Sequence, residues 1–442
     1  MSSRLKHVAH YAYFVAPNAS GTLKTETPRE VRETGLGDLP FWLETPGMTN
    51  SSILSAVRTP IGRFGGKLSH LTAAQLAAIA IKEALARAGV SPEQVDLTIV
   101  GHARQAANGP NPARQAALAA GIPVERPAWT LNQACASGLA AIDHAHKALL
   151  LGDAEIVVAA GMESMSRVPY YLENARWGLR LGHDQLVDGM YKDGFFCPMS
   201  DMVMGETAEL LVDEFRITRA EQDEFAADSQ QKCEAARSAG KFVDEIVGVE
   251  VKEKREKVLL TTDEHPRDGV KAEKLQKLPP VYKLDAREGT VTAGNASGIT
   301  DGASALVLTT ADKARELGLE EMARYQGGVV VGLPPRRMGL GPVHAVAELE
   351  RKFNRTVADF DIVELNEAFA AQVIACQRTL KIPSGKLNPN GGSIALGHPI
   401  GCTGNRMAVT LLHELKRRGG GRGLATLCVS GGFGIAGMFE IP

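Results

Sequence analysis

The chain has 442 residues, and its 49 basic and 51 acidic side chains leave a formal net charge of −2. This balance argues against a nucleic-acid binder, which would carry a basic surplus, although a local patch can still hold an anionic ligand. Hydrophobic residues make up 44% of the chain, with no apolar run near the ~20 residues of a membrane span. We expect a soluble protein of two or three packed layers or two domains.

The six cysteines are spread singly, without a Cys-x-x-Cys pair. This spacing predicts neither a disulfide scaffold nor a zinc site, so we expect no metal. Free thiols persist in a reducing compartment, which favours a cytoplasmic location.

Residues 1–47 mix His, Tyr, Pro, Thr and Glu without helical or strand periodicity. They contain no apolar core like that of a signal peptide, and their acidic residues argue against a mitochondrial transit peptide. We expect an N-terminal extension, either a disordered and dispensable arm or the product of a start codon placed too far upstream. Regular patterning begins at Met48.

Helices and short β-branched strands alternate in the first patterned segment. The pattern predicts a helix over Thr72–Ala88, a strand over Val95–Val100, a helix that begins at Cys135 and a strand over Glu155–Ala160. Such alternation is typical of helices packed against a sheet.

Residues 167–292 have a different texture. Helical patterns cover Gly205–Glu214 and Arg219–Ala239, and Thr218 precedes the second as part of a capping box. A segment of interspersed charges follows at Lys252–Lys277. We expect residues 167–292 to form an inserted loop domain.

A second alternating segment resembles the first. It predicts a helix over Pro342–Phe353, a strand over Phe360–Leu365, a glycine-rich loop around His398, a helix over Asn405–Arg418 and a strand over Leu424–Val429. The repetition predicts an α/β fold built from two duplicated halves, with loops of both halves meeting at one face. We expect the N-terminal half over residues 48–166 plus 293–297, and the C-terminal half over 298–442.

Four residues in small-residue loops carry the chemistry. Cys135 stands at a predicted helix start, where the helix dipole and free N–H groups favour a thiolate nucleophile; a small buried residue in a turn is the alternative. Cys428 ends a strand before Ser430, in a turn whose N–H groups can form an oxyanion hole, or it is a core cysteine. His398 could bind a thioester oxygen or relay a proton to Cys135, or it could cap backbone carbonyls. Asn366 could begin and cap a helix, or hold a water.

Taken together, these motifs resemble the thiolase family from Met48 to the end of the chain. The matching motifs, in order and at family-like spacing, are Asn132–Gly138, Gly161–Ser164, Thr290–Gly302, Asn366–Phe369, Gly391–Gly404 and Cys428–Gly434. The resemblance implies a layered α-β-α-β-α fold with an inserted loop domain. It also implies an enzyme that passes an acyl group between a cysteine and coenzyme A, which is a substrate and not a permanently bound cofactor.

By this resemblance Cys135 is the nucleophile and Cys428 the acid and base at the acetyl-CoA methyl group. His398, with a water held by Asn366, would stabilise the enolate, and the N–H groups of Cys135 and Ser430 would form the oxyanion hole. A covalent intermediate on cysteine predicts ping-pong kinetics.

The resemblance assigns coenzyme A contacts to Arg267, Ser297 and Met204, although Arg267 could be a solvated charge and Met204 a core residue. Val203 and Cys402 depart from biosynthetic members and tilt the expectation toward a broad 3-ketoacyl-CoA thiolase over an acetoacetyl-CoA-specific enzyme. The family also implies a homodimer or homotetramer.

Three other functions stay open. Ketoacyl synthases share the fold, but they usually carry histidine or asparagine where this chain has Cys428. A catalytically silent CoA- or lipid-binding member would have lost one of Cys135, His398 and Cys428, and none is lost. A thiol redox sensor would pair Cys135 with Cys428.

Overall fold

The computed structural model of the chain describes residues 50–442 except 254, 283, 285 and 286. The chain divides into two units at Pro46 and Gly47, and the second unit is the one described below. The N-terminal extension expected over residues 1–47 lies outside the described residues.

A ten-stranded mixed sheet forms the centre of the described unit. Its strand order is β14-β15-β16-β13-β1-β12-β5-β3-β4, and β2 pairs with β12 beside this path. The strands are β1 (Ser51–Arg58), β2 (Gly62–Arg63), β3 (Leu97–Gly101), β4 (Ala128–Leu131), β5 (Ile156–Ser164), β12 (Thr300–Thr309), β13 (Ala323–Gly332), β14 (Ile362–Leu365), β15 (Gly421–Val429) and β16 (Phe433–Ile441).

The same strand order occurs twice, which confirms the duplication. The first half reads β4-β3-β5-β12-β1, and the second reads β14-β15-β16-β13, with Leu387 bridging to Val363 in the place of a fifth strand. In each half the first two pairings are parallel and the last two antiparallel. A short antiparallel pairing of β1 with β13 joins the halves.

Strand pairing also bears on the boundary between the halves. β12 pairs with β1 and β5, so residues 300–309 lie in the first half, although the sequence-based boundary at residue 298 assigned them to the second. The boundary at residue 298 left β12 on the other side because the pattern of a strand in the sequence does not show which strands it will pair with. We propose that the halves divide after Thr309.

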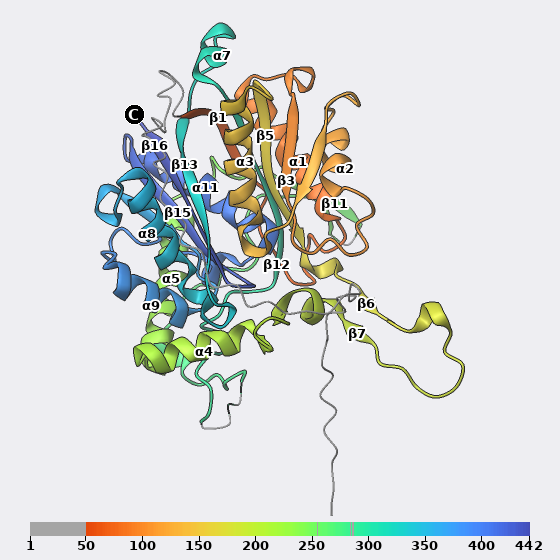
Figure 1. The fold of residues 1–442 in the computed structure, drawn as a ribbon, viewed down its shortest axis with the longest axis vertical. Helices are drawn as coiled ribbons and strands as arrows, with labels where there is room; N and C mark the ends of the chain where they lie inside the picture. The colour runs from red at the N-terminus through yellow and green to blue at the C-terminus, as the bar shows by residue number, and fades with distance from the viewer. Residues whose placement is uncertain (1–49, 254, 283, 285–286) are drawn as a thin grey trace, which may run out of the picture. The chain divides into compact units, whose positions relative to one another are not determined.

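Three groups of helices give the expected α-β-α-β-α layering. Helices α1 (Ala73–Ala88) and α2 (Pro112–Ala119) share a core with the first half, and α8 (Gly341–Phe353) and α9 (Ala370–Leu380) share one with the second. Between them, α3 (Ser137–Leu151) and α11 (Ile400–Arg417) share a core with strands of both halves. Figure 1 shows α8 and α9 at the left, α3 and α11 in the middle, and α1 and α2 at the right.

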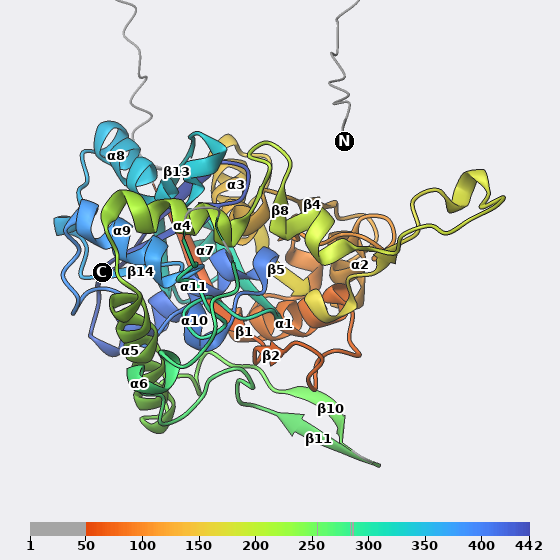
Figure 2. The same cartoon turned by 90° about the horizontal axis from the view of Figure 1, so that it is seen from below.

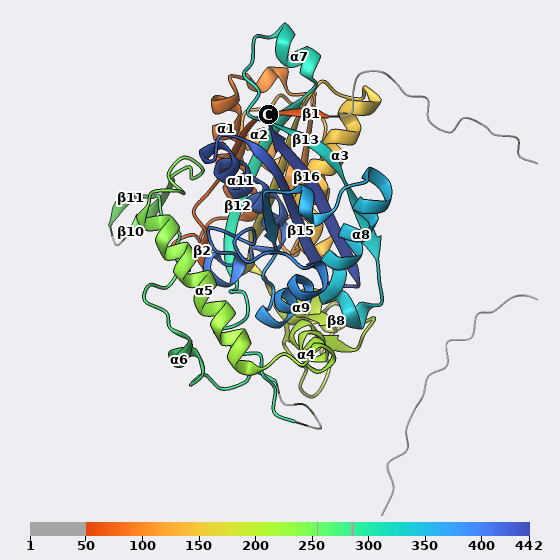
Figure 3. The same ribbon diagram turned by 90° about the vertical axis from the view of Figure 1, so that its left-hand side faces the viewer.

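The inserted segment contains the remaining longer helices. Helix α5 begins with the expected capping box, in which the Thr218 N–H donates to Glu221 Oε2 at 2.7 Å. Figure 2 shows the β10–β11 hairpin projecting from the unit, and Figure 3 shows α5 beside α6. The elements of the insert are β6 (Tyr170–Tyr171), β7 (Val187–Asp188), β8 (Phe196–Cys197), β9 (Met202–Val203), α4 (Met204–Phe215), α5 (Arg219–Ser238), β10 (Val249–Glu253), β11 (Glu256–Leu260) and α6 (Ala272–Leu275). Helix α7 (Ala311–Glu316) lies between β12 and β13.

The described helices include none that is both long and apolar enough to cross a membrane.

Helix α11 begins at Ile400, five residues before the predicted start at Asn405. The glycine-rich stretch before Asn405 suggested a loop, because glycine disfavours helices. In the structure, Gly404 and Gly401 lie where α11 meets α3, so close that a Cβ at Gly404 would be 2.6 Å from the Leu139 nitrogen. Tertiary packing therefore outweighs the low helix propensity of glycine.

We expect Gly404→Ala to lower the free energy of unfolding by about 1–3 kcal/mol, because the new methyl group would meet the backbone of α3. Gly385→Ala is the matched control, since a Cβ there meets nothing within 4 Å, and its effect should stay within about 0.5 kcal/mol. Urea denaturation of both variants measures the difference. Equal midpoints would contradict the close approach of the two helices.

Candidate active site

Loops from both halves meet in one cavity, as the duplication predicted. Cys135 comes from the start of α3, His398 precedes α11, and Cys428 and Ser430 flank the end of β15. The cavity wall contains all four, with the candidate coenzyme A contacts Met204 and Ser297. The remaining wall residues are Arg104, Ala134, Gly194, Phe195, Met338, Ala368, Phe369 and Ile400.

A tight turn presents Cys135 to this cavity. Ala134 adopts a positive φ of 47°, a conformation that L-residues rarely take. Ser137 stabilises the turn, because its hydroxyl donates to the Ala134 carbonyl at 2.7 Å and accepts the Gln133 N–H at 2.9 Å. The Asn132 side-chain oxygen accepts the Ala134 N–H at 2.9 Å. The local strain is thus balanced by side chains of the Asn132–Gly138 motif.

Burial opposes the thiolate that the helix start was expected to favour. It raises the pKa of the Cys135 thiol, although the N–H groups of Ser430 and Cys135 and the charge of Arg104 act to lower it. Burial is the largest of these effects. The two backbone groups expected to form an oxyanion hole are therefore aimed at the cysteine sulfur.

His398 is buried and neutral. Its Nδ1 lies 2.6 Å from the Thr403 hydroxyl, which donates to the Pro399 carbonyl at 2.9 Å and so accepts from Nδ1–H. This network, from which we assign the tautomer, leaves Nε2 as an acceptor without a partner among the described residues. Burial, with the charges of Arg406 and Arg104, lowers the pKa of His398 to about 3. The unpartnered Nε2 of the neutral ring is therefore the atom that faces a proton or hydrogen-bond donor.

Cys428 is buried beside Met338 and Ala368, with Met204 packed against the same cluster. Burial raises the pKa of the Cys428 thiol well above its usual value, and the nearby Cys135 raises it further because two thiolates would repel. Cys428 therefore rests as a thiol that can donate a proton inside the cavity.

Asn366 does not line the cavity and does not begin a helix, because α9 starts at Ala370. The helix-cap interpretation was wrong. The Asn366 side-chain oxygen accepts from the Ser393 hydroxyl at 2.6 Å, which fixes the amide, while its buried Nδ2 has no partner among the described residues. The free amide donor is compatible with holding a water.

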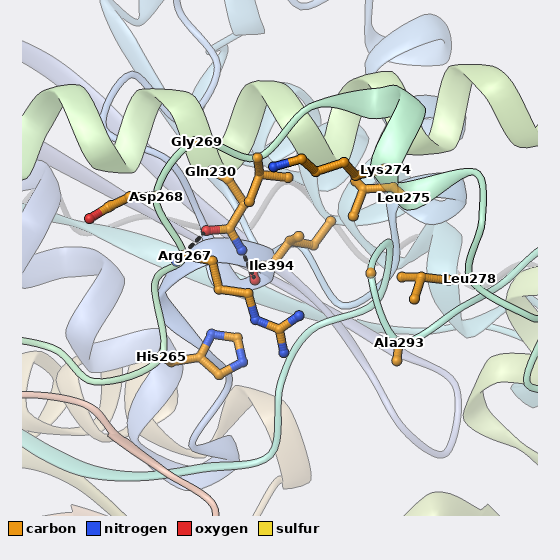
Figure 4. Close-up of a pocket in the computed structure, with 12 residues that line it drawn as sticks. Gln230, His265, Arg267, Asp268, Gly269, Lys274, Leu275, Leu278, Ala293 and Ile394 are labelled. Carbon is orange, nitrogen blue, oxygen red and sulfur yellow. Dashed lines mark hydrogen bonds between the residues drawn. The ribbon is translucent and has the colours of Figure 1, made fainter.

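The coenzyme A candidates line consecutive cavities. Met204 and Ser297 line both the Cys135 cavity and a neighbouring cavity, the channel. The channel shares Ala293 with a third cavity, the outer cavity. Arg267 lines this third cavity, and Figure 4 shows its side chain next to His265. The Arg267 N–H donates to Gln230 at 2.9 Å, as Figure 4 also shows.

Sequence reasoning missed Lys274 and His265 in the outer cavity and Arg104 beside Cys135. The only signal for Arg104 was its own charge, three residues after the buried strand β3. A charged residue in that position usually lies in a solvated loop. It also missed Glu163, a buried carboxylate that accepts N–H groups of Arg104 at 3.1 Å and Gly401 at 2.9 Å. Glu163 thereby ties the loop after β3 to the start of α11.

Two protein-family models match the chain: the thiolase N-terminal domain over residues 51–312 and the thiolase C-terminal domain over 319–441. Acetyl-CoA acetyltransferase of Cupriavidus necator is 48% identical over 390 residues, which cover 88% of this chain and 98% of that protein.

Solved structures agree in fold. The acetyl-CoA acetyltransferase of Bacillus anthracis superposes with a TM-score of 0.85 at 46% identity, covering 88% of this chain and 98% of that one. Human mitochondrial 3-ketoacyl-CoA thiolase in complex with CoA gives a TM-score of 0.85 at 41% identity, covering 89% and 98%.

Iodoacetamide should alkylate Cys135 first, because Cys135 is half-buried and the other five cysteines are buried. We expect the rate to rise with pH and to be still rising at pH 9, because burial raises the thiol pKa and the thiolate is the reactive form. Peptide mass spectrometry over pH 6–10 measures it, with Cys135→Ala as the control. A rate already constant from pH 6 to 8 would reveal a thiolate–imidazolium pair instead.

Proposed function

This chain belongs to the thiolase family of acyltransferases, and we propose that it carries the acyl group on Cys135 and exchanges it with coenzyme A. The observation that carries the proposal is the single cavity shared by Cys135, His398, Cys428 and the Ser430 turn.

In the thiolysis direction, Nε2 of His398 takes the Cys135 proton, and the sulfur attacks the 3-keto carbon of a 3-oxoacyl-CoA. The N–H groups of Cys135 and Ser430 stabilise the oxyanion that forms. The bond between C2 and C3 then breaks, with its electron pair staying on C2. The products are an acyl thioester on Cys135 and the enolate of acetyl-CoA.

The second set of steps uses the other cysteine. His398, now protonated, and a water held by Asn366 stabilise the enolate oxygen, and Cys428 donates its proton to C2. After acetyl-CoA leaves, a new coenzyme A gives its thiol proton to Cys428 and attacks the acyl group. Cys135 departs as a thiolate and recovers its proton from His398. Condensation of two acyl-CoA molecules is the reverse, and both directions are ping-pong.

Buried, neutral groups suit this chemistry. A thiol has an ordinary pKa of about 8.5, so it can both give and take a proton near neutral pH when the partner carbon forms an enolate. Burial holds Cys428 protonated until the enolate appears. It also keeps His398 unprotonated at rest, so Nε2 is free to take the Cys135 proton as the sulfur attacks the substrate.

Coenzyme A would lie along the three consecutive cavities. Arg267 and Lys274 supply positive charge at the outer end for the phosphates, and Ser297 and Met204 line the way to Cys135. The human relative, solved in complex with CoA, supports coenzyme A as the ligand.

We also propose a substrate range, a location and an oligomeric state for the enzyme. Val203 and Cys402 favour a broad 3-ketoacyl-CoA thiolase, whereas the names of the bacterial relatives favour acetoacetyl-CoA as the alternative. We place the enzyme in the cytoplasm, where Cys135 stays reduced, as a homodimer or homotetramer by analogy with the family.

Two half-reaction assays test the roles of the cysteines. We expect Cys428→Ala to lose acetoacetyl-CoA cleavage by more than about 100-fold, and to slow the exchange of acetyl groups between acetyl-CoA and labelled coenzyme A much less, because exchange needs no carbon acid and asks Cys428 only to accept a thiol proton. Cys135→Ala should lose both reactions, and Cys233→Ala, a substitution in the core of the insert, serves as the control. Exchange that survives in Cys135→Ala would refute the covalent route.

Arg267→Gln should raise the KM for coenzyme A about tenfold by removing charge from the outer cavity, with kcat little changed. The KM for a pantetheine thioester that lacks the nucleotide should stay the same. Arg315→Gln, an exposed arginine paired with Asp312, is the matched control. Equal losses with both substrates would show that Arg267 acts on the fold and not on the nucleotide.

A further inference from the structure

Arg104 places a buried positive charge in the wall of the Cys135 cavity. The residue is 5% exposed and forms no ion pair among the described residues within 4 Å. Its Nη1 donates to the Asp193 backbone carbonyl at 2.8 Å, and its Nε is buried without a protein partner. Arginine is rarely buried without a carboxylate, because its charge loses the solvation of water.

The surroundings hold the guanidinium in position. A Cβ at residue 194 would coincide with it, so only the glycine found there leaves the space. The Phe195 ring centroid lies 6.0 Å from the Arg104 Cζ. The nearby carboxylates have other partners. Asp193 accepts the hydroxyl of Tyr171, and the buried Glu163, whose charge acts on Arg104, pairs with His102 and accepts the Arg104 backbone N–H. The guanidinium is therefore a buried cation that no carboxylate contacts within 4 Å among the described residues.

The position of Arg104 in the cavity indicates which end of a substrate it faces. Phe195, Met204, Ser297, Phe369, His398 and Ile400 line both the Cys135 cavity and the channel toward the outer cavity. Arg104 lines the Cys135 cavity but not the channel, as do Met338 and Ala368. It therefore lies on the side occupied by the acyl chain that Cys135 carries, away from the coenzyme A moiety.

We propose that Arg104 is a specificity-determining residue that binds a carboxylate at the far end of a short acyl chain on Cys135. The proposal rests on the function proposed above and names its substrate class: 3-oxoacyl-CoA thioesters that end in a carboxylate. An acyl carboxylate would give the guanidinium the direct partner that the described residues do not supply, with the paired geometry in which guanidinium groups bind carboxylates.

A competing role for Arg104 is to stabilise the Cys135 thiolate by its charge. That role would change the reaction of every substrate by the same factor, because the thiolate is common to all. Binding of an acyl carboxylate changes charged and neutral substrates differently. The two roles are separated by comparing reagents that differ only in a terminal carboxylate.

The first test uses alkylation of Cys135 and needs no turnover. Iodoacetate carries a carboxylate where iodoacetamide carries an amide of nearly the same size. We expect Arg104→Met to lower the ratio of the iodoacetate rate to the iodoacetamide rate at least fivefold at pH 8, and Arg104→Lys to lower it less. Arg315→Met, at an exposed position, controls for net charge. An unchanged ratio in Arg104→Met, with Cys135 still alkylated, would overturn the proposal even if the chain were not a thiolase.

The second test compares two six-carbon 3-oxoacyl-CoA substrates, one ending in a carboxylate and one in a methyl group. We expect kcat/KM to favour the carboxylate at least tenfold in the natural protein, and Arg104→Met to reduce this preference at least tenfold. A natural preference for the methyl-ended substrate, or a preference that Arg104→Met leaves intact, would overturn the proposal. If neither substrate is cleaved, the proposed function fails while the alkylation ratio still decides on Arg104.

Discussion

The close approach of α3 and α11 holds the two halves of the fold, and the cavity between them, together. Gly138 and Gly404 bring the two helix backbones into contact, and a Cβ at Gly138 would lie 2.8 Å from the Asn405 nitrogen. Each helix belongs to a different half of the fold, and each carries a reactive residue at its start, Cys135 on α3 and His398 before α11. A larger side chain at this crossing would separate the halves and divide the cavity between them.

Burial then decides the chemistry that this cavity supports. It raises the thiol pKa values of Cys135 and Cys428 and lowers the imidazole pKa of His398, so the resting site holds three neutral groups. Neutral groups are cheaper to bury than an ion pair, and they can exchange protons with a substrate without passing them to water. Backbone N–H groups at Cys135 and Ser430 remain in place for the charge that develops during the reaction.

Arg104 is the exception to this neutrality. The protein surrounds it with Gly194, Phe195 and a backbone carbonyl, and no carboxylate contacts it within 4 Å among the described residues, although the charge of the buried Glu163 acts on it. A charge without a direct partner costs stability, and proteins accept such costs mainly at functional sites. The inserted segment contributes Gly194 and Met204 to the same cavity wall, so under the proposed function it would shape both the acyl end and the coenzyme A end of the site.

Periodicity, helix caps and glycine-rich motifs are local properties, so the chain's pattern was enough to predict the duplicated α/β halves, the helix that Thr218 caps, and the loops of Cys135, His398 and Cys428. The same pattern misplaced the start of α11, the half to which β12 belongs and the setting of Asn366, and it gave no sign of Arg104. Each of these depends on contacts between segments distant in the chain: a helix crossing that tolerates glycine, the pairing partners of a strand, and the burial of polar side chains. Such contacts form only when the two halves pack together, so no local pattern contains them.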